Sequence, residues 1–256
     1  MPLLPTHLHD GVATVSFHHP KGNSLPSSLL SELAQEISAL ATNASARVIV
    51  LRSEGTGPFC AGASFDELTA ISTPESGKEF FSGFSRVLLA MIRAPQFVLV
   101  RVQGKAAGGA VGLIAAGDLS FAVKSAPARL SELAIGIGPF VVGPCIEKKI
   151  GLAAFSTMAA GADWQDAEWC ERHGLYSQIF DTPEAMDAAI DGRAQVLAAS
   201  NPEAMAKLKK IFWAGTEHWD QLLADRAAMS GTLVLSAFTR DAIARFNQRP
   251  APPPAR

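Results

Sequence analysis

The sequence predicts an α/β fold, in which a mainly parallel sheet is covered by helices and followed by a helical C-terminal region. Strand-like runs at Val48–Leu51, Phe97–Val102 and Leu119–Val123 alternate with turns and helical patterns, as in repeated βαβ units. After about Gly143 such runs nearly stop. Hydrophobic residues make up 48% of 256 residues and charged residues 18%, enough to bury a sizeable core.

The first elements follow from residue spacing. The segment Val12–Phe17 alternates loosely between apolar and polar residues, as an early strand does. Apolar residues then recur at helical spacing from Leu29 to Leu40, with Ser27 or Ser28 as the N-cap. Since Val48–Leu51 is apolar without interruption, we expect this strand to be buried on both faces.

The middle of the chain alternates between helical and strand patterns. From Glu67 to Ala94 we expect a mobile loop and a helix that ends at Pro95, with a break in the pattern at Thr73–Gly77. The strand Phe97–Val102 follows. Small and apolar residues fill Gly109–Gly117, as in a buried helix packed tightly on a sheet, before the strand Leu119–Val123.

Helices dominate the remainder. Asn201-Pro202 is a start signal, because Asn caps a helix and Pro suits its first position, and His173-Gly174 is a stop signal. The proline-rich residues 249–254 predict a frayed tail. We therefore divide the chain into an α/β core, 1–195, and a helical C-terminal region, 196–256. The predicted helices are Ala154–Ala160, Trp164–Arg172, Pro183–Ala199, Pro202–Trp213, Trp219–Met229 and Leu235–Asn247.

Charge and composition argue against several classes of protein. The formal net charge is −2, so clustered cations for nucleic acid are not expected, and Lys207, Lys209 and Lys210 are read as a solvated helix face. No charged-then-apolar leader opens the chain, and no apolar run reaches the ~20 residues that span a bilayer. We expect a cytoplasmic protein with no membrane or nucleic-acid partner.

Cysteine and histidine spacing gives no metal or disulfide signal. The 3 cysteines, Cys60, Cys145 and Cys170, are an odd number without CxxC spacing, so we expect reduced thiols, with Cys60 as a buried filler. The 6 histidines are also not spaced as ligands, and no metal site is predicted.

Two glycine-bearing turns follow the apolar strands at Val48–Leu51 and Phe97–Val102, at Gly57–Ser64 and Gln103–Ala110. Small residues at strand ends let two backbone N–H groups approach one oxygen, which stabilises negative charge developing on a carbonyl. A carboxylate, Glu132, follows among apolar neighbours, which raise a carboxyl pKa and suit it to proton transfer near neutrality. Together these features indicate enolate chemistry on a thioester.

The same segments resemble the crotonase superfamily, the enoyl-CoA hydratase/isomerase family. Pro20–Leu25 resembles its first CoA-binding stretch, Phe59–Ala63 its Phe-x-Ala-Gly-Ala turn, and Gly104–Ala110 its Gly-x-Ala-x-Gly-Gly-Gly/Ala turn. The resemblance runs from Val12 to Phe246. It implies a spiral of ββα units, an acyl-CoA thioester substrate, no cofactor apart from the CoA of that substrate, and a homotrimer or dimer of trimers built through the helical C-terminal region.

The resemblance also implies the roles of individual residues. The N–H groups of Ala63 and Gly109 form the oxyanion hole, and Glu132 moves a proton beside the thioester carbonyl. Lys21 lies near the CoA phosphates, and the backbone from Ala61 to Asp66 approaches the adenine and the pantetheine arm. The implied CoA-binding residues are Lys21, Gly22, Ala61, Ala63, Ser64, Phe65, Asp66 and Gly109.

The chain departs from the family pattern at several positions. Gly112 stands where typical hydratases carry a second Glu, and Asp66, Glu67 or Glu79 are the alternative sources of that group. Asp118, by contrast, matches a structural position.

Two further departures concern the turns and the acyl pocket. Ser64 replaces a frequent Asp and is expected to cap the next helix. Phe140 stands in a loop that is richer in glycine in many relatives, where it either narrows the acyl pocket or packs in the core.

Three functions stay open. One carboxylate suffices to isomerise an enoyl-CoA, whereas hydration naturally uses two, so the sequence does not separate isomerase from hydratase. Thioester hydrolysis in the same oxyanion hole is a second possibility. The third is a catalytically inactive CoA-ester-binding scaffold, for which Gly112 and Ser64 are the support.

Overall fold

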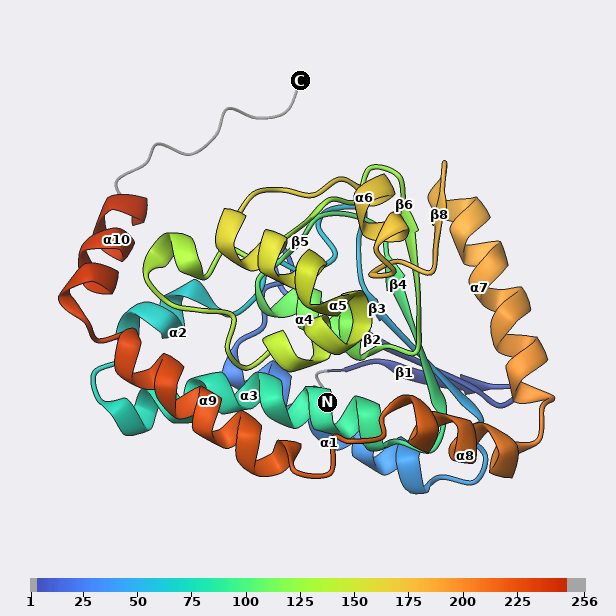
Figure 1. The fold of residues 1–256 in the computed structure, drawn as a ribbon. Coiled ribbons are helices and arrows are strands. Elements are labelled where there is room, and N and C mark those ends of the chain that lie inside the picture. The colour runs from blue at the N-terminus through green and yellow to red at the C-terminus, as the bar shows by residue number, and fades with distance from the viewer. Residues whose placement is uncertain (1–3, 248–256) are drawn as a thin grey trace.

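A computed structural model describes residues 4–247, and its centre is a six-stranded sheet in the order β1-β2-β3-β4-β6-β8 (Figure 1). Only β1 runs antiparallel to its neighbour; the other neighbouring pairs are parallel. A separate two-stranded parallel sheet joins β5 and β7. The strands are β1 (Thr6–His9), β2 (Val12–Phe17), β3 (Val48–Ser53), β4 (Phe97–Val102), β5 (Ala106–Ala107), β6 (Leu119–Val123), β7 (Ala128–Arg129) and β8 (Gln178–Phe180).

The register aligns the strands that precede the two glycine turns. Val48 of β3 pairs with Val12 on one side and with Phe97 on the other, so β2, β3 and β4 start level. All of β4 and nearly all of β3 are buried, and the burial of β3 confirms the prediction from its apolar sequence. The sequence did not predict β1 and β8, which are short edge strands with few buried residues.

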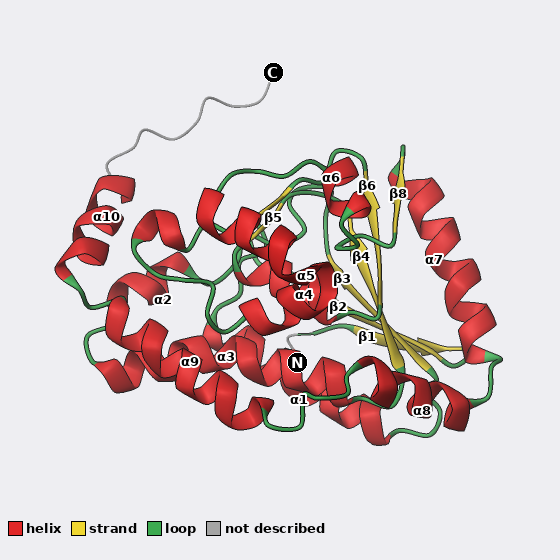
Figure 2. Ribbon diagram, viewed as in Figure 1, coloured by secondary structure: helices red, strands yellow, loops and turns green. Residues whose placement is uncertain are grey.

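Helices lie on both sides of the sheet (Figures 1 and 2). Helix α7 packs along one face, and α4 and α5 lie on the other side. A 3-10 helix, η1, precedes α5. These elements are α1 (Ser27–Thr42), α2 (Phe65–Ala70), α3 (Pro74–Arg93), α4 (Gly109–Ala116), η1 (Leu133–Ile135), α5 (Gly143–Gly161), α6 (Ala167–Arg172), α7 (Pro183–Ala198), α8 (Pro202–Phe212), α9 (Trp219–Leu233) and α10 (Ala237–Asn247).

Local sequence signals correctly predicted two helix boundaries. Asn201 caps α8 by accepting from the N–H groups of Glu203 and Ala204, as predicted. Helix α6 ends before His173, and Gly174 takes the left-handed φ of 82° that favours glycine.

Two predictions about helix starts were wrong. The N-cap of α1 is Pro26, not a serine; the Ser27 backbone and hydroxyl instead donate to the Glu67 carboxylate at 2.9 and 2.6 Å. Thr73–Gly77 does not break a helix but begins α3, since Thr73 and Ser76 form a reciprocal capping box. Tertiary and reciprocal contacts decided these positions, which single-residue preferences do not reveal.

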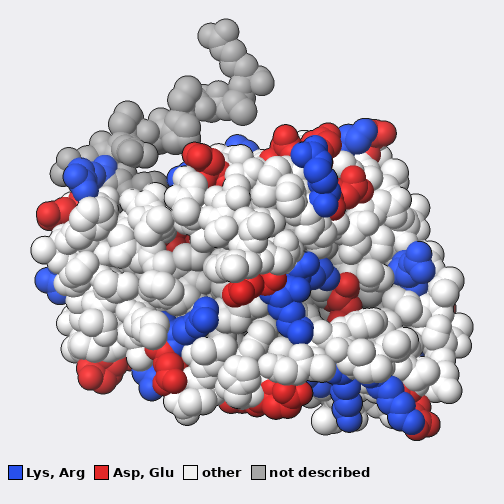
Figure 3. All heavy atoms as spheres, viewed as in Figure 1, with Lys and Arg blue, Asp and Glu red and all other residues white. Residues whose placement is uncertain are grey.

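Lys209 corrects the prediction of a solvated lysine face on α8. Lys207 and Lys210 are exposed, but the Lys209 side chain is 2% exposed and its ammonium lies 2.9 Å from the Asp118 carboxylate. This pair ties α8 to the loop before β6, in the structural position predicted for Asp118. On the face shown in Figure 3, basic and acidic side chains are interspersed.

The helical C-terminal region returns to the first part of the chain. Helix α9 packs along α3, where a Cβ on Gly77 would lie only 2.6 Å from the Cα of Gly231. The division at residue 195 and the trimeric assembly stay predictions, and the predicted frayed tail, 249–254, lies outside the described residues. No helix within residues 4–247 is both long and apolar enough to cross a bilayer.

Candidate active site

The two glycine turns lie against each other beyond the carboxyl ends of β3 and β4. The Cys60 N–H donates to the Lys105 carbonyl at 3.3 Å, and the Ala107 N–H donates to the Cys60 carbonyl at 3.0 Å. Gly62 has a φ of 92°, and a Cβ there would lie 2.8 Å from the Ala107 carbonyl oxygen. Only glycine combines this conformation with so close an approach.

The N–H groups of Ala63 and Gly109 are available to a ligand. Their neighbours are engaged: the Ser64 N–H donates to the Leu25 carbonyl at 3.1 Å, and the Gly108 N–H donates to the Arg129 carbonyl at 2.8 Å. Within residues 4–247, neither the Ala63 N–H nor the Gly109 N–H has a hydrogen-bond acceptor. Gly109 is also the first residue of α4, whose dipole favours negative charge at this end.

Glu132 lies directly beside the second turn. It precedes η1, and its Oε1 would be 3.3 Å from a Cβ placed on Gly108, while its Oε2 is buried without a hydrogen-bond partner among the described residues. Burial raises the pKa of the Glu132 carboxyl to about 7, against smaller lowering contributions from the Glu132 and Ser131 backbone and the Arg129 charge. A pKa near neutrality suits a group that both accepts and returns a proton.

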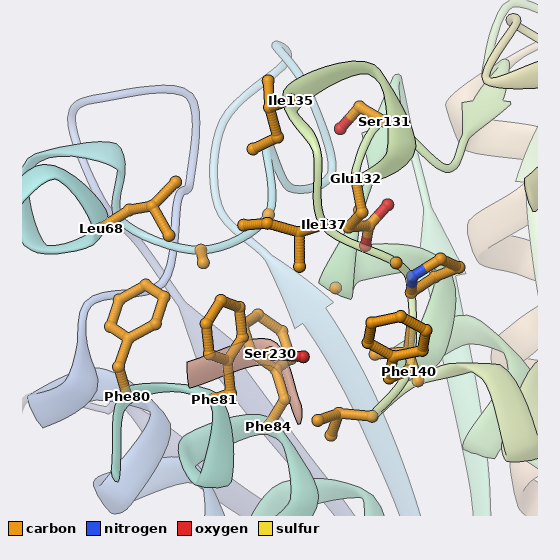
Figure 4. A pocket seen from close by; sticks show the side chains of 18 of the residues that line it. Leu68, Phe80, Phe81, Phe84, Ser131, Glu132, Ile135, Ile137, Phe140 and Ser230 are labelled. Atoms are coloured by element: carbon orange, nitrogen blue, oxygen red, sulfur yellow. The ribbon is translucent and has the colours of Figure 1, made fainter. Parts of the chain in front are cut away.

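A pocket of about 140 Å³ connects Glu132 with the two turns (Figure 4). Glu132 is the only titratable residue among those that line it, and Ser131 and Ser230 supply the other polar side chains. The wall is otherwise apolar, with aromatic rings from α2, α3 and the loop before α5. The lining side chains of that wall include Phe65, Leu68, Phe80, Phe81, Phe84, Ile135, Ile137, Phe140, Val141 and Val142.

Phe140 lines this pocket instead of packing wholly in the core. It is half-buried, and its ring folds back over Gly138, where a Cβ would come within 2.4 Å of the ring. In Figure 4 the ring lies on the same side of the pocket as Glu132. The alternative in which Phe140 narrows the pocket is therefore the one that the structure supports.

Packing explains why residues 109 and 112 are glycine, and the sequence did not reveal this reason. A Cβ on Gly109 would come within 2.2 Å of the Phe84 ring, so packing against α3 requires glycine there. At Gly112 a Cβ would lie 2.6 Å from the Val142 Cγ1. Val142 thus fills the space that a second carboxylate would need, and no side chain fits at residue 112 without its displacement.

The alternative sources of a second carboxylate are all engaged elsewhere, and none lines the pocket. Asp66 forms an ion pair with Lys21, and Glu79 pairs with Arg86 at 2.6 Å. Glu67 accepts from both the backbone and the hydroxyl of Ser27. The prediction that this segment might supply the second group is therefore not supported, and the segment is helical, not a mobile loop.

The predicted CoA-binding residues come together along one edge of the first turn. The Ala61 N–H donates to the Gly22 carbonyl at 3.0 Å, and the exposed Lys21 pairs with the exposed Asp66. Ser64 caps α2, as predicted, by accepting from the Glu67 N–H, and Phe65 begins that helix. Lys21 and Asp66 can both reach solvent, as groups that meet a large polar ligand must.

Sequence reasoning missed two features of the pocket. Ser230 reaches it from α9, and the paired Phe80 and Phe81 rings, 5.1 Å apart, form its wall. Phe80, Phe81 and Phe84 recur in the sequence at positions typical of an apolar helix face, but such spacing cannot distinguish the wall of a cavity from a filled core. No sequence signal linked Ser230 to residues more than 90 positions earlier.

No cysteine or histidine is among the described residues that line the pocket. All three cysteines are free and buried, and burial raises the pKa of Cys60, Cys145 and Cys170 to about 12. Thiolates are therefore scarce at neutral pH. Across residues 4–247, His, Cys, Asp and Glu side chains form no cluster of three that could hold a metal ion.

Comparison with known proteins identifies relatives of this chain. Residues 7–246 match the profile of the family described as enoyl-CoA hydratase/isomerase. The chain is 30% identical to methylglutaconyl-CoA hydratase of Rattus norvegicus over 181 residues, which are 70% of this chain and 57% of that relative. It is 28% identical over 252 residues to a probable enoyl-CoA hydratase of Rhodobacter capsulatus, covering 96% and 95% of the two chains.

A solved structure supports the same assignment at the level of fold. The enoyl-CoA hydratase of Bacillus halodurans superposes with a TM-score of 0.88 at 18% identity, covering 95% of this chain and 99% of that one. The predicted crotonase-type α/β fold is thus confirmed. The profile match over nearly the whole length, with the fold and the paired glycine turns, shows that this chain belongs to the enoyl-CoA hydratase/isomerase family.

Proposed function

We propose that this protein is an acyl-CoA enzyme that stabilises a thioester enolate and moves one proton with Glu132, and that it isomerises 3-enoyl-CoA esters to 2-enoyl-CoA esters. The observation that carries this proposal is the single titratable group in the pocket. Glu132 has a buried, unpartnered Oε2, and it lies beside two unengaged N–H groups. One carboxylate of this kind is enough for a proton shift between carbons.

The proposed reaction needs no co-reactant. The Glu132 carboxylate removes a proton from the carbon next to the thioester carbonyl, and the electron pair moves into the carbonyl, leaving negative charge on its oxygen. The N–H groups of Ala63 and Gly109 stabilise that oxyanion. Protonated Glu132 then returns the proton two carbons further along, at C4, and the electrons re-form the carbonyl with a new C2–C3 double bond.

Hydration of a 2-enoyl-CoA is the second candidate, because the family description includes it. It requires a proton at C2 and an activated water at C3, tasks that two carboxylates divide naturally. Val142 fills the space beside Gly112, so Glu132 would have to perform both tasks in turn. Thioester hydrolysis uses the same oxyanion hole but would release free CoA, and a binding scaffold would turn over nothing.

The test follows the conjugated thioester absorbance with purified protein and either a 3-enoyl-CoA or a 2-enoyl-CoA. We expect absorbance to rise with the 3-enoyl ester, and Glu132→Gln to lower the rate by about 10²–10⁴-fold. Glu79→Gln is the matched control, since its carboxylate pairs with Arg86 outside the pocket. Loss of absorbance from the 2-enoyl ester alone would replace isomerisation by hydration; release of CoA or silence with both esters would contradict both.

A further inference from the structure

The acyl pocket combines small size, aromatic walls and an absence of cations. We propose that it accepts a compact, uncharged acyl group built around one hydrocarbon ring, and that it rejects acyl groups carrying a second carboxylate. This inference rests on the proposed acyl-CoA function and adds the class of acyl group. It depends on the side chains that line the pocket and not on the type of reaction.

Size sets the first limit. The pocket measures about 140 Å³. An apolar cavity of about 150 Å³, engineered in another protein, binds one benzene molecule. Leu68 and Phe80 line the end of the pocket away from Glu132, and Phe140 lies on the Glu132 side (Figure 4). A single ring beside the thioester therefore fits this volume, whereas a long straight chain would extend beyond it.

The wall favours a flat apolar group. Phe80 and Phe81 stand edge to face, with an angle of 87° between their rings, and Phe84 and Phe140 add two more rings (Figure 4). Aromatic pairs prefer edge-to-face or offset contacts, each worth about 0.5–1.5 kcal/mol beyond the area buried. Rings presented at several orientations give a bound ring such contacts on more than one side.

Charge sets the second limit. Among the described residues, no Lys, Arg or His lines the pocket, and the one ionisable group that does, Glu132, is acidic. The Ser230 hydroxyl already donates to the Arg226 carbonyl at 3.2 Å, and the Arg226 guanidinium donates to the Phe140 carbonyl at 3.4 Å from outside the lining. An acyl carboxylate would thus be buried beside an acidic side chain, with no cation among the residues that line the pocket, which is strongly unfavourable.

The absence of cations in the pocket lining distinguishes this chain from the acyl group that one relative's name states. The relative in Rattus norvegicus is named for methylglutaconyl-CoA, whose acyl group carries a second carboxylate. The pocket described above has no group to neutralise that charge. The shared family therefore does not extend to a shared acyl group.

The experiment measures binding of free CoA and of CoA esters that are not enoyl esters by calorimetry, so that no turnover is needed. The probes are phenylacetyl-CoA, dodecanoyl-CoA, glutaryl-CoA and free CoA. We expect phenylacetyl-CoA to bind at least about 30-fold tighter than glutaryl-CoA, since an unpaired buried charge costs more than an unpaired neutral polar group. Dodecanoyl-CoA should also bind more weakly than phenylacetyl-CoA. Equal or tighter binding of glutaryl-CoA would overturn the charge limit, and equal or tighter binding of dodecanoyl-CoA the size limit.

Two variants test the named side chains. Ile135→Lys places a cation at a half-buried position of the lining and should raise the affinity for glutaryl-CoA at least about tenfold, while Ile135→Met should leave it unchanged. Phe140→Ala should raise dodecanoyl-CoA affinity relative to phenylacetyl-CoA, whereas Phe140→Leu should change the ratio less. If neither variant shifts its ratio, these side chains do not select the acyl group.

Failure of this inference is distinguishable from failure of the proposed function. Exchange of the α-protons of phenylacetyl-CoA in heavy water reports enolate formation by Glu132, whichever ester binds best. Exchange without the expected order of affinities would leave the enzyme proposal intact and remove the acyl assignment. The expected affinities without exchange would do the reverse.

Discussion

At the scale of single residues, burial of the Glu132 carboxylate destabilises the folded protein and also suits the residue to its proposed role. In the part of the chain that the structure describes, its Oε2 is buried without a hydrogen-bond partner and no cationic residue lines the pocket. An unpaired buried carboxylate is less stable charged than neutral, so its pKa rises. The same feature that destabilises the folded protein at high pH sets the proton affinity near neutrality.

Glu132 should therefore make stability fall as pH rises. Its pKa is about 7 when folded, against 4.5 for an ordinary carboxyl, so the folded state holds the proton more tightly between these values. The free energy of unfolding should decrease across this window by up to about 3 kcal/mol and level off above pH 7. Urea unfolding should show that the stability of Glu132→Gln relative to wild type is higher at pH 8 than at pH 5. A difference that is independent of pH would contradict this assignment.

Gly112 and Val142 form a second residue-scale pair. Because a Cβ at residue 112 would lie 2.6 Å from the Val142 Cγ1, Gly112→Ala should destabilise the protein by about 1–3 kcal/mol. Val142→Ala should remove the clash, so the double variant should be more stable than the sum of the single effects predicts. Denaturant unfolding of the four proteins measures this coupling, and simple additivity would show that Val142 does not occupy the space.

At the scale of elements, the contact between α3 and α9 holds one wall of the pocket. Phe80, Phe81 and Phe84 come from α3, and Ser230 comes from α9. The two helices approach closely because glycines face each other at Gly77 and Gly231. The geometry of the acyl pocket thus depends on a helix contact between distant parts of the chain.

Gly77→Ala should separate these helices. The added Cβ would lie 2.6 Å from the Gly231 Cα, which is backbone and cannot rotate away, so we expect a loss of more than about 2 kcal/mol. Gly192→Ala in α7 is the matched control, since a Cβ there meets nothing within 4 Å and should stabilise its helix by about 0.5–1 kcal/mol. Thermal unfolding distinguishes the two; equal effects would mean that the contact is not tight.

At the scale of the whole molecule, one buried ion pair joins the helical C-terminal region to the sheet. The Lys209 ammonium lies 2.9 Å from Asp118 and also donates to the Gln96 carbonyl at 2.7 Å. Asp118 further accepts from the Val98 N–H at 2.7 Å at the start of β4. Burial lowers the pKa of Lys209, and the Asp118 charge opposes that shift.

Breaking this pair should destabilise the fold strongly. Lys209→Met leaves the Asp118 carboxylate buried without its cation, which should cost about 3–5 kcal/mol. Lys207→Met on the same helix is the control; it loses only an exposed pair with Glu203 and should change stability by less than about 1 kcal/mol. Denaturant unfolding should give clearly different losses of stability for the two variants. Similar losses would show that the buried ion pair does not contribute strongly to stability.

The predicted trimer belongs to this scale. Large apolar side chains stay exposed on the helical part of one chain, among them Ile211, Met229 and Phe238. Light scattering should give about 81 kDa for a trimer, three times the 27.0 kDa of one chain, or twice that for a dimer of trimers. A mass of one chain at micromolar concentration would contradict the prediction.

The sequence by itself determined the features that depend on neighbouring residues. Apolar runs located β3, β4 and β6, glycine and asparagine signals located helix ends, and the two turns with Glu132 located the candidate site. These succeeded because hydrophobic periodicity, positive φ and capping are decided within a few residues.

Only the tertiary structure decided what fills the space around those residues. It showed that Val142 occupies the room beside Gly112, that Phe84 requires Gly109, that Lys209 is buried against Asp118, and that Ser230 reaches the pocket. Each of these depends on atoms from segments far apart in the chain, packed at distances that a linear pattern does not encode. Local pattern thus located the proposed reacting groups, while packing decided how many acids line the pocket and the pocket shape from which we propose its acyl group.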